Sequence, residues 1–440
     1  MRARFDLVAV GLACFTLGAA CTHFPRARAE ADSPHALLGQ LARVLVLVEN
    51  EYVDPVDRGR LLEGAIKGMV AELDPHSTYM PADDNAVFQG ETDGHFGGVG
   101  VEVEVRDGAI IVLAPIEGGP AERAGVRSGD RIVAIDGAPT AGEKLDVLVK
   151  KMRGAPGTRV RVDVEREGQT GKRTIELSRE QIKVSSVTWR RLADGVLYLR
   201  LKQFQATTHE ELLRAISQAR GAGPVRGALL DLRGNPGGLV DQAVAVADEI
   251  LASGGVYATT RRGRQVEEVK ATPGGALVDV PVVVIVNEYS ASASELVAGA
   301  LQDAGRALVV GAPTFGKGSV QSILELPLGA GMRLTTMRYV TPKGRMIQAK
   351  GITPDVVVPM ALRGGVPPRE RDLDGHLSPR DGLPLPIEPR PAAPGAPAPS
   401  ASVALASPVP PKDPPDDPRG GADAQLARAF ELLRERLPGR

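Results

Sequence analysis

The chain contains very little cysteine. Of its 440 residues only Cys14 and Cys21 are cysteine, and both lie in the first thirty. The rest of the chain therefore has no thiol that could form a disulfide, bind a metal or act as a nucleophile. Histidine is also scarce: His23, His35, His76, His95, His209 and His376. No two of them stand at the spacing of a metal-binding pair, so we expect no metal site.

Neither sign of charge is in excess. There are 53 Lys and Arg residues against 54 Asp and Glu residues, which gives a formal net charge of -1. Aromatic residues make up only 3% of the chain, and no basic run is interleaved with them. This composition argues against nucleic-acid binding. At 43% hydrophobic residues the chain can bury a substantial core, and its length suggests two or three domains.

The first 29 residues have the pattern of a signal peptide. Arg2 and Arg4 precede an apolar stretch at 7–20, and small residues then offer cleavage sites after Ala20 or Ala29. We therefore expect export to the periplasm or to the outer face of the cytoplasmic membrane. The stretch is shorter than the roughly 20 residues of a membrane span, which favours cleavage over a retained anchor that would hold the protein at the membrane. Lipidation at Cys21 stays open.

The pattern of apolar residues changes along the chain and predicts five further segments. Residues 33–92 show helical spacing, and residues 93–182 show short alternating strands with two short helices. Residues 183–360 alternate strands and helices. Residues 361–421 are rich in proline and predict a disordered linker. Residues 422–440 predict an amphipathic helix that docks on the core or on a second chain, which leaves a homo-oligomer open.

The segment at 183–360 is typical of an α/β fold. Aliphatic strands at 196–202, 227–232, 280–286 and 307–310 are separated by helices. Such units form a parallel sheet covered by helices, with right-handed crossovers. Ligand sites in these folds tend to lie at the carboxyl ends of the strands.

A repeated serine marks the start of the helix after the third of these strands, in SASASELVAG at 290–299. Ser292 and Glu295 have the spacing of a capping box, which is a structural reading. The same position also suits a nucleophile, because a helix N-terminus has free N–H groups and a positive dipole end that stabilise an oxyanion. Ser290 and Ser294 lie two positions before and two positions after Ser292. The repeat of serines alone does not show which of the three would be the nucleophile.

A serine nucleophile needs a base, and His209 is the only histidine between residues 184 and 358. Lysine is the other candidate, although its reference pKa of about 10.4 must fall by burial. The stretch GAPTFGKGSVQS, residues 311–322, places Lys317 between two glycines, where Phe315 and Val320 can form an apolar wall. The structural alternative is an exposed lysine in a glycine-rich turn.

The same stretch nearly matches a nucleotide-binding P-loop. Gly311, Gly316 and Lys317 have the required spacing, but position 318 is glycine where Ser or Thr would bind magnesium. The residues that follow, SVQSILELPL, predict a strand, whereas a P-loop leads into a helix. Both departures argue against a nucleotide hydrolase.

A glycine-rich motif, DLRGNPGG at residues 231–238, follows the second strand of the core. Structurally it is a turn and a helix start. Functionally, glycine leaves the backbone N–H groups open to a substrate, which suits the binding of a developing oxyanion.

Together the three motifs, in this order and at these separations, resemble those of the C-terminal processing peptidases, or tail-specific proteases. The resemblance covers residues 37–358 and implies a crotonase-like α/β protease core. It implies that Ser292 is the nucleophile, that Lys317 is the general base and that Gln321 orients the lysine. It also implies an oxyanion hole formed by the N–H groups of Gly238 and Ala293. By the same resemblance, Ser294 and Glu295 have structural roles.

The β-rich segment resembles a PDZ domain inserted before the core, through HFGGVGVEV at 95–103 and PAERAGVRSGDRIVAIDG at 120–137. Successive N–H groups of its loop would bind a terminal carboxylate while the peptide adds as a strand. The expected peptide-binding residues are Gly97, Gly98, Val99, Gly100 and Val101. A PDZ domain that serves only as a scaffold is the alternative.

These features together predict an exported serine endopeptidase that recognises protein C-termini and needs no cofactor. Its expected substrates are proteins with exposed apolar C-termini, and by resemblance an envelope adaptor protein can deliver them. The alternative is not an enzyme but a catalytically silent scaffold that binds peptides through the PDZ domain. The sequence does not identify the physiological substrate.

Overall fold

The computed structural model describes residues 34–106, 109–116, 118–143, 145–169, 171–359, 367–378 and 415–438. The chain divides into two compact units, Met1–Met69 and Val70–Arg440, and each is described by itself. The predicted signal peptide at residues 1–29 lies outside the described residues.

The first unit is helical where it is described. It contains α2 (Pro34–Glu51) and most of α3 (Arg58–Ala71). Along α2 many apolar side chains are exposed: Leu37, Leu38, Leu41, Val44, Val46 and Leu47. Within the part of the chain that the structure describes, no helix combines the length and the apolar character of a membrane span.

The second unit begins with a short strand and a helix, β1 (Thr78–Met80) and α4 (Ala82–Thr92). These lead to a two-stranded antiparallel pair of β2 (His95–Gly98) with β9 (Glu180–Lys183). The residues between these two strands form a domain with its own hydrophobic core, which we call the β-rich domain (residues 95–183).

The β-rich domain has a sheet in the order β3-β4-β5-β7-β8, with β6 paired to β5. Its strands are β3 (Val101–Arg106), β4 (Ala109–Pro115), β5 (Arg131–Ile135), β6 (Ala138–Pro139), β7 (Arg159–Glu165) and β8 (Arg173–Ser178). Two short helices, α5 (Pro120–Arg123) and α6 (Leu145–Met152), accompany it. The predicted short strands and two helices are thus confirmed. Because β3 lies at an end of this order, its outer edge is unpaired among the described strands.

A six-stranded sheet in the order β10-β11-β12-β15-β16-β19 forms the centre of the α/β core. Its strands are β10 (Val187–Arg191), β11 (Val196–Leu201), β12 (Gly227–Asp231), β15 (Val282–Val286), β16 (Ala307–Gly311) and β19 (Val356–Val357). All pairs except β10 with β11 are parallel. Every residue of β12 and β15 is buried, as expected for aliphatic strands covered on both faces.

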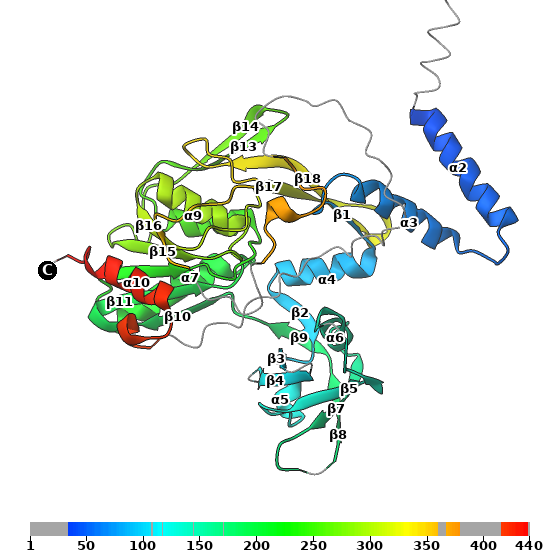
Figure 1. Cartoon of the computed structure of the whole chain (residues 1–440), viewed down its shortest axis with the longest axis horizontal. Helices are drawn as coiled ribbons and strands as arrows, with labels where there is room; N and C mark the ends of the chain where they lie inside the picture. Colours follow the sequence, from blue (N-terminus) through cyan, green and yellow to red (C-terminus); the bar gives the residue numbers. More distant parts are fainter. Residues whose placement is uncertain are drawn as a thin grey trace, which may run out of the picture. The chain divides into compact units, whose positions relative to one another are not determined.

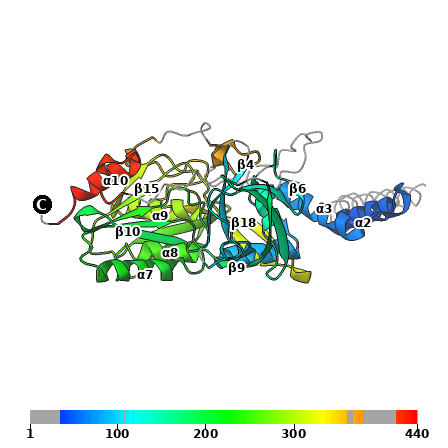
Figure 2. The same ribbon diagram turned by 90° about the horizontal axis from the view of Figure 1, so that it is seen from below.

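Helices cover the two faces of this sheet. On one face pack α7 (Thr208–Gly221), α8 (Val240–Asp248) and α9 (Ala293–Asp303). On the other face packs α10 (Ala424–Arg434), whose Phe430 and Leu433 are completely buried. Figure 2 shows α10 on one side of the strands and α7 and α8 on the other. The terminal amphipathic helix therefore docks on its own core, which the sequence left open.

A second sheet packs near α9 and carries the residues that follow Lys317. It has the order β1-β18-β13-β14, with β17 paired to β18. Its further strands are β13 (Gly255–Arg261), β14 (Arg264–Lys270), β17 (Ser319–Glu325) and β18 (Gly331–Val340). The strand predicted after Lys317 is confirmed as β17. This strand is incompatible with a P-loop, which would continue into a helix.

The predicted linker at 361–421 is too long. Residues 367–378 and 415–421 are part of the folded unit and contain short 3₁₀ turns at Glu370–Asp372 and Pro418–Gly420. Two further 3₁₀ turns lie elsewhere in the unit, at Ala193–Gly195 and Pro327–Gly329. Glu370 is completely buried. The composition predicted disorder because the stretch has few apolar residues. Its charged residues are instead held by polar partners in the core. The rest of the predicted linker lies outside the described residues.

Candidate active site

The three serines before α9 have different environments. Ser290 is fully buried, and its Oγ donates to the carbonyl oxygen of Leu232 at 2.8 Å. Ser294 is also fully buried, and its Oγ donates to the carbonyl oxygen of Asn235 at 3.0 Å. Both side chains tie the turn before α9 to the glycine-rich motif. Ser292 is only partly buried, which leaves it as the accessible serine of the three.

The backbone of Ser292 is strained. Its φ of 55° and ψ of -115° lie in a region that non-glycine residues rarely adopt. Such strain is typical of functional sites, including serine nucleophiles on sharp turns between a strand and a helix. The turn places Ser292 at the N-terminus of α9, where the helix dipole favours negative charge.

One buried carboxylate connects this turn to the loop that carries Lys317. Oε2 of Glu295 accepts hydrogen bonds from the backbone N–H groups of Ser292 and Lys317, each at 2.8 Å. Oε1 accepts from the N–H of Gly316 at 2.7 Å and from the hydroxyl of Thr314 at 2.5 Å. The two backbone nitrogens on Oε2 are therefore separated by at most twice 2.8 Å. The bond from Ser292 is also the carboxylate half of the predicted capping box.

Burial raises the pKa of Glu295 to about 7, although four hydrogen bonds to the carboxylate oppose the shift. The side chain is completely inaccessible to solvent. Burying a carboxylate costs desolvation free energy, and the four donors on Glu295 offset part of that cost.

Lys317 lies directly before β17, and its residue as a whole is partly buried. Desolvation of its ammonium, followed by the positive charge of Arg333, lowers the pKa of Lys317 to about 8. The charges of Glu370, Asp74 and Glu295 act in the opposite direction. The predicted apolar neighbour Phe315 is buried. Near neutral pH a fraction of the molecules therefore carries Lys317 as the neutral amine.

The ammonium of Lys317 has no direct hydrogen-bond partner among the described residues. Its Nζ is therefore not bonded to Oγ of Ser292, nor to Gln321. The amide of Gln321 instead donates to Oγ of Ser319 at 2.8 Å and to Oγ1 of Thr335 at 3.2 Å. Gln321 is near the lysine in sequence, and its side chain points into the hydroxyl network of β17 and β18.

The glycine-rich motif packs directly against the Ser292 turn. Asn235 is fully buried and accepts hydrogen bonds from the N–H of Gly237 at 2.9 Å and of Ala291 at 3.0 Å. Gly237 has a φ of 104°, and a Cβ atom there would lie 2.8 Å from Cβ of Ser292. Only glycine allows this approach.

Two backbone N–H groups, one in the glycine-rich motif and one at the start of α9, are without acceptors in the described part of the chain. They belong to Gly238, which is exposed, and to Ala293, the first residue of α9. These are the two groups that the sequence resemblance implied for an oxyanion hole. Free N–H groups of this kind can bind an oxygen on which negative charge develops.

The start of the same motif is anchored through an ion pair that the sequence analysis did not find. Burial works to raise the pKa of Asp231, but the charge and hydrogen bonds of Arg233 hold it below its ordinary value. The guanidinium of Arg233 bonds to Asp231 at 2.6 Å and to Asp423 at 2.8 Å. Asp423 is the N-cap of α10. The C-terminal helix is therefore linked to the motif that contains Gly238.

The sequence analysis also missed a set of polar residues that includes two carboxylates, Asp74 and Glu370, whose charges act on Lys317. Asp74 accepts from Oγ of Ser77 at 2.7 Å and from Oγ1 of Thr335 at 3.1 Å. Glu370 lies 2.7 Å from Nε2 of His76. Apart from Ser77 and Asp74, the residues that bond to one another come from parts of the chain 258 to 294 positions apart, so no local motif could have revealed them.

In the β-rich domain the predicted carboxylate loop is only partly a loop. Gly97 and Gly98 belong to β2, where they pair with Gln181 and Glu180. Val99 and Gly100 follow the strand and are buried, and their N–H groups have no acceptor among the described residues. Val101 begins β3. The free N–H groups and the unpaired edge of β3 suit a peptide that ends in a carboxylate.

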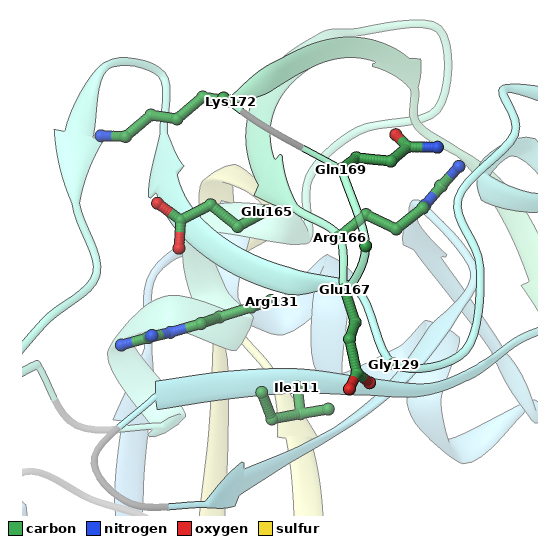
Figure 3. A pocket seen from close by; sticks show the side chains of 10 residues that line it. Ile111, Gly129, Arg131, Glu165, Arg166, Glu167, Gln169 and Lys172 are labelled. Atoms are coloured by element: carbon green, nitrogen blue, oxygen red, sulfur yellow. The ribbon is translucent and has the colours of Figure 1, made fainter.

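A surface pocket with a volume of about 680 Å³ lies elsewhere on the β-rich domain. Arg131, Glu165, Glu167 and Lys172 line it with charges of both signs, as Figure 3 shows. None of the candidate residues contributes to it. Over the residues that the structure describes, no group of three or more His, Cys, Asp or Glu side chains could hold a metal ion.

Comparison with known proteins gives matches in three parts of the chain. The model of peptidase family S41 matches residues 195–358, and that of the PDZ domain matches residues 111–166. The model named for the N-terminal domain of the activating protease CtpB matches residues 19–84.

Two curated relatives match large parts of the chain. A carboxy-terminal-processing protease of Bartonella bacilliformis is 40% identical over 409 residues, which cover 90% of this chain and 88% of that protein. A probable CtpA-like serine protease of Staphylococcus haemolyticus is 38% identical over 314 residues, which cover 71% of this chain and 62% of that protein. A solved structure of a photosystem II D1 C-terminal processing protease is 31% identical, with a TM-score of 0.46 over 70% of this chain and 84% of that one.

Proposed function

The chain belongs to the carboxy-terminal-processing proteases of peptidase family S41, and we propose that it is a serine endopeptidase that cleaves proteins captured by their C-termini. The observation that carries the proposal is the single Glu295 oxygen that accepts from the backbone of both Ser292 and Lys317. It fixes an accessible hydroxyl and a desolvated amine on neighbouring turns, which is the arrangement that a serine–lysine peptidase needs.

In the proposed acylation step, neutral Lys317 accepts the hydroxyl proton of Ser292 while Oγ adds to the carbonyl carbon of the scissile bond. The carbonyl electron pair moves to oxygen, and the N–H groups of Gly238 and Ala293 bind the resulting oxyanion. When this intermediate collapses, the leaving amine takes the proton from Lys317. An ester on Ser292 remains.

In the proposed deacylation step, Lys317 accepts a proton from water as the water attacks the ester carbonyl. The second oxyanion occupies the same pair of N–H groups, and its collapse returns the proton to Oγ of Ser292. The missing bond between Nζ and Oγ in the free protein fits this scheme, because catalytic hydrogen bonds often tighten only with substrate bound. Gln321 then acts on the lysine indirectly: its amide donates to Thr335, the hydroxyl of Thr335 donates to Asp74, and the charge of Asp74 acts on the amine.

For substrate capture, we assign the terminal carboxylate to the N–H groups of Val99 and Gly100, with Gly97, Gly98 and Val101 shaping the site. The upstream residues of the substrate add to the free edge of β3. Apolar C-termini are the expected ligands. The proposal also includes export by the N-terminal signal and delivery of substrates by an envelope adaptor. It further includes formation of a homo-oligomer and a crotonase-like ancestry of the core.

The test compares cleavage of a labelled peptide that has an apolar C-terminus with cleavage of the same peptide amidated at its C-terminus. Ser292→Ala and Lys317→Ala should each lower kcat by about 10³-fold or more. Ser253→Ala and Lys343→Ala change exposed residues of the same core and serve as matched controls. Amidation should raise KM for the wild-type protein, because the carboxylate no longer meets the loop.

Undiminished turnover in Ser292→Ala or Lys317→Ala would remove the catalytic assignment. The alternative is a protein that binds peptides but has no catalytic activity. In that case the wild-type protein would bind the free-acid peptide and cleave neither peptide.

A further inference from the structure

Residues 367–378 lie against the loop that carries Lys317, close to β17 (orange in Figure 1). The N–H of Glu370 donates to the carbonyl oxygen of Phe315 at 3.1 Å. The guanidinium of Arg369 donates to the carbonyl oxygen of Thr314. Two consecutive residues of this segment therefore bind two consecutive carbonyl groups just before Lys317. Glu295 binds the same loop from the side of α9.

The carboxylate of Glu370 extends this contact to the other side of the lysine. Its Oε1 accepts from Nε2 of Gln348 at 2.7 Å, and Oε1 of Gln348 accepts from the N–H of Gly318 at 3.0 Å. The amide of Gln348 also donates to the carbonyl oxygen of Leu377 at 3.2 Å. Residues on both sides of Lys317 are thus held by one segment that follows the core in the chain.

Glu370 also contributes charge. It is completely buried, and its Oε2 lies 2.7 Å from Nε2 of His76. Its negative charge raises the pKa of Lys317, as do those of Asp74 and Glu295, whereas Arg333 lowers it. A neutral side chain could hold the turn without the cost of burying an ion. The negative charge of Glu370 therefore acts on the lysine amine as well as facing His76.

We propose that residues 367–378 form a clasp on the Lys317 loop and that Glu370 is a positioning residue that sets both the place and the basicity of the lysine amine. This inference rests on the proposed function, because it concerns the same base. The clasp restrains the backbone on either side of Lys317, and the carboxylate prevents the amine from losing its proton too easily. A lysine that is too weak a base would accept the hydroxyl proton of Ser292 poorly.

Glu370→Gln separates charge from contact. The amide oxygen can still accept from Gln348 and the amide nitrogen can face His76, so the clasp persists while the negative charge is lost. The acid limb of the profile of kcat/KM against pH should move to lower pH by roughly half a unit or more. Asp374→Asn removes one negative charge from an exposed position of the same segment and should leave the limb in place.

Glu370→Ala removes both the contacts and the charge. We expect kcat to fall about tenfold with KM nearly unchanged, because the amine loses its position while substrate capture in the β-rich domain is untouched. Thermal unfolding of each variant shows whether the fold persists. A purely structural role would lower the Tm of both Glu370 variants and leave the acid limb of Glu370→Gln at the wild-type pH.

An acid limb that coincides in Glu370→Gln, Asp374→Asn and the wild-type protein would overturn the inference, whatever Glu370→Ala does. If Ser292→Ala and Lys317→Ala are inactive in the same assay, the proposed function survives that result. If they are fully active, the proposed function fails and the assignment of Glu370 fails with it.

Discussion

Ser292 and Lys317 are held in register by one atom: their backbone N–H groups donate to the same oxygen of Glu295, each at 2.8 Å. The residues are far apart in the chain, and their side chains make no direct bond in the free protein. Their relative position is therefore set by main-chain anchoring to a buried carboxylate.

The pH dependence of activity should follow the amine of Lys317. Burial lowers its pKa to about 8, and only the neutral amine can act as a base. Below that pH most molecules carry the ammonium, so kcat/KM should rise about tenfold per unit as the pH approaches 8 and then level off. Initial rates between pH 5.5 and 10 measure this limb. A limb near the reference value for lysine would show that the amine is not desolvated in solution.

Glu295→Gln should disturb both members of the pair. Each oxygen of Glu295 accepts two hydrogen bonds, and an amide nitrogen cannot accept any, so two donors lose their partner. We expect kcat to fall about 100-fold and the free energy of unfolding to fall by about 2 kcal/mol. Steady-state kinetics and urea denaturation measure the two effects. Wild-type kcat in a folded variant would show that the shared oxygen does not align the site.

Gly237→Ala should damage catalysis more than its backbone strain explains. Its Cβ would lie 2.8 Å from Cβ of Ser292, so the motif or the nucleophile must move. Gly254 has nearly the same φ, 102° against 104°, and open space around it, which makes Gly254→Ala the matched control for strain alone. We expect kcat to drop about 100-fold in Gly237→Ala only. Equal kinetics in the two variants would contradict a close approach at Ser292.

Phe430→Ala tests how much the C-terminal helix stabilises the core. The ring is completely buried between α10 and the sheet, so the substitution should lower the free energy of unfolding by about 3 to 5 kcal/mol. Arg428→Ala changes an exposed residue of the same helix and should cost less than about 0.5 kcal/mol. Denaturant titrations of the three proteins give these differences. If both variants match the wild type, α10 does not stay docked in solution.

The sequence predicted the central sheet well because its strands are continuous aliphatic runs between clear helices. The run at β15, for example, is Val-Val-Val-Ile-Val, and all five residues are buried. The second sheet was missed except for β17. Strand β14 is almost wholly exposed, and most of β18 is only partly buried, so neither shows the apolar pattern of a core strand.

The motifs likewise drew attention to the turn of Ser292 and the loop of Lys317. The family resemblance implied an oxyanion hole at Gly238 and Ala293, and that role stays a prediction. The polar residues around the lysine could not be found in this way. Glu370 lies in a stretch whose composition indicates disorder, and its contact with His76 spans 294 positions. Long-range polar contacts of this kind depend on how the sheets pack, which local patterns do not encode.

Helix α10 comes after every strand of the central sheet in the chain, yet it packs on one face of that sheet. A ribosome that has reached residue 358 has already made all the candidate catalytic residues, while Tyr198, Leu229 and Ile285 still lack their apolar cover. These side chains become fully buried only once residues 424–434 have been synthesised. The order of synthesis therefore leaves this face of the sheet without its apolar cover until α10 has been made.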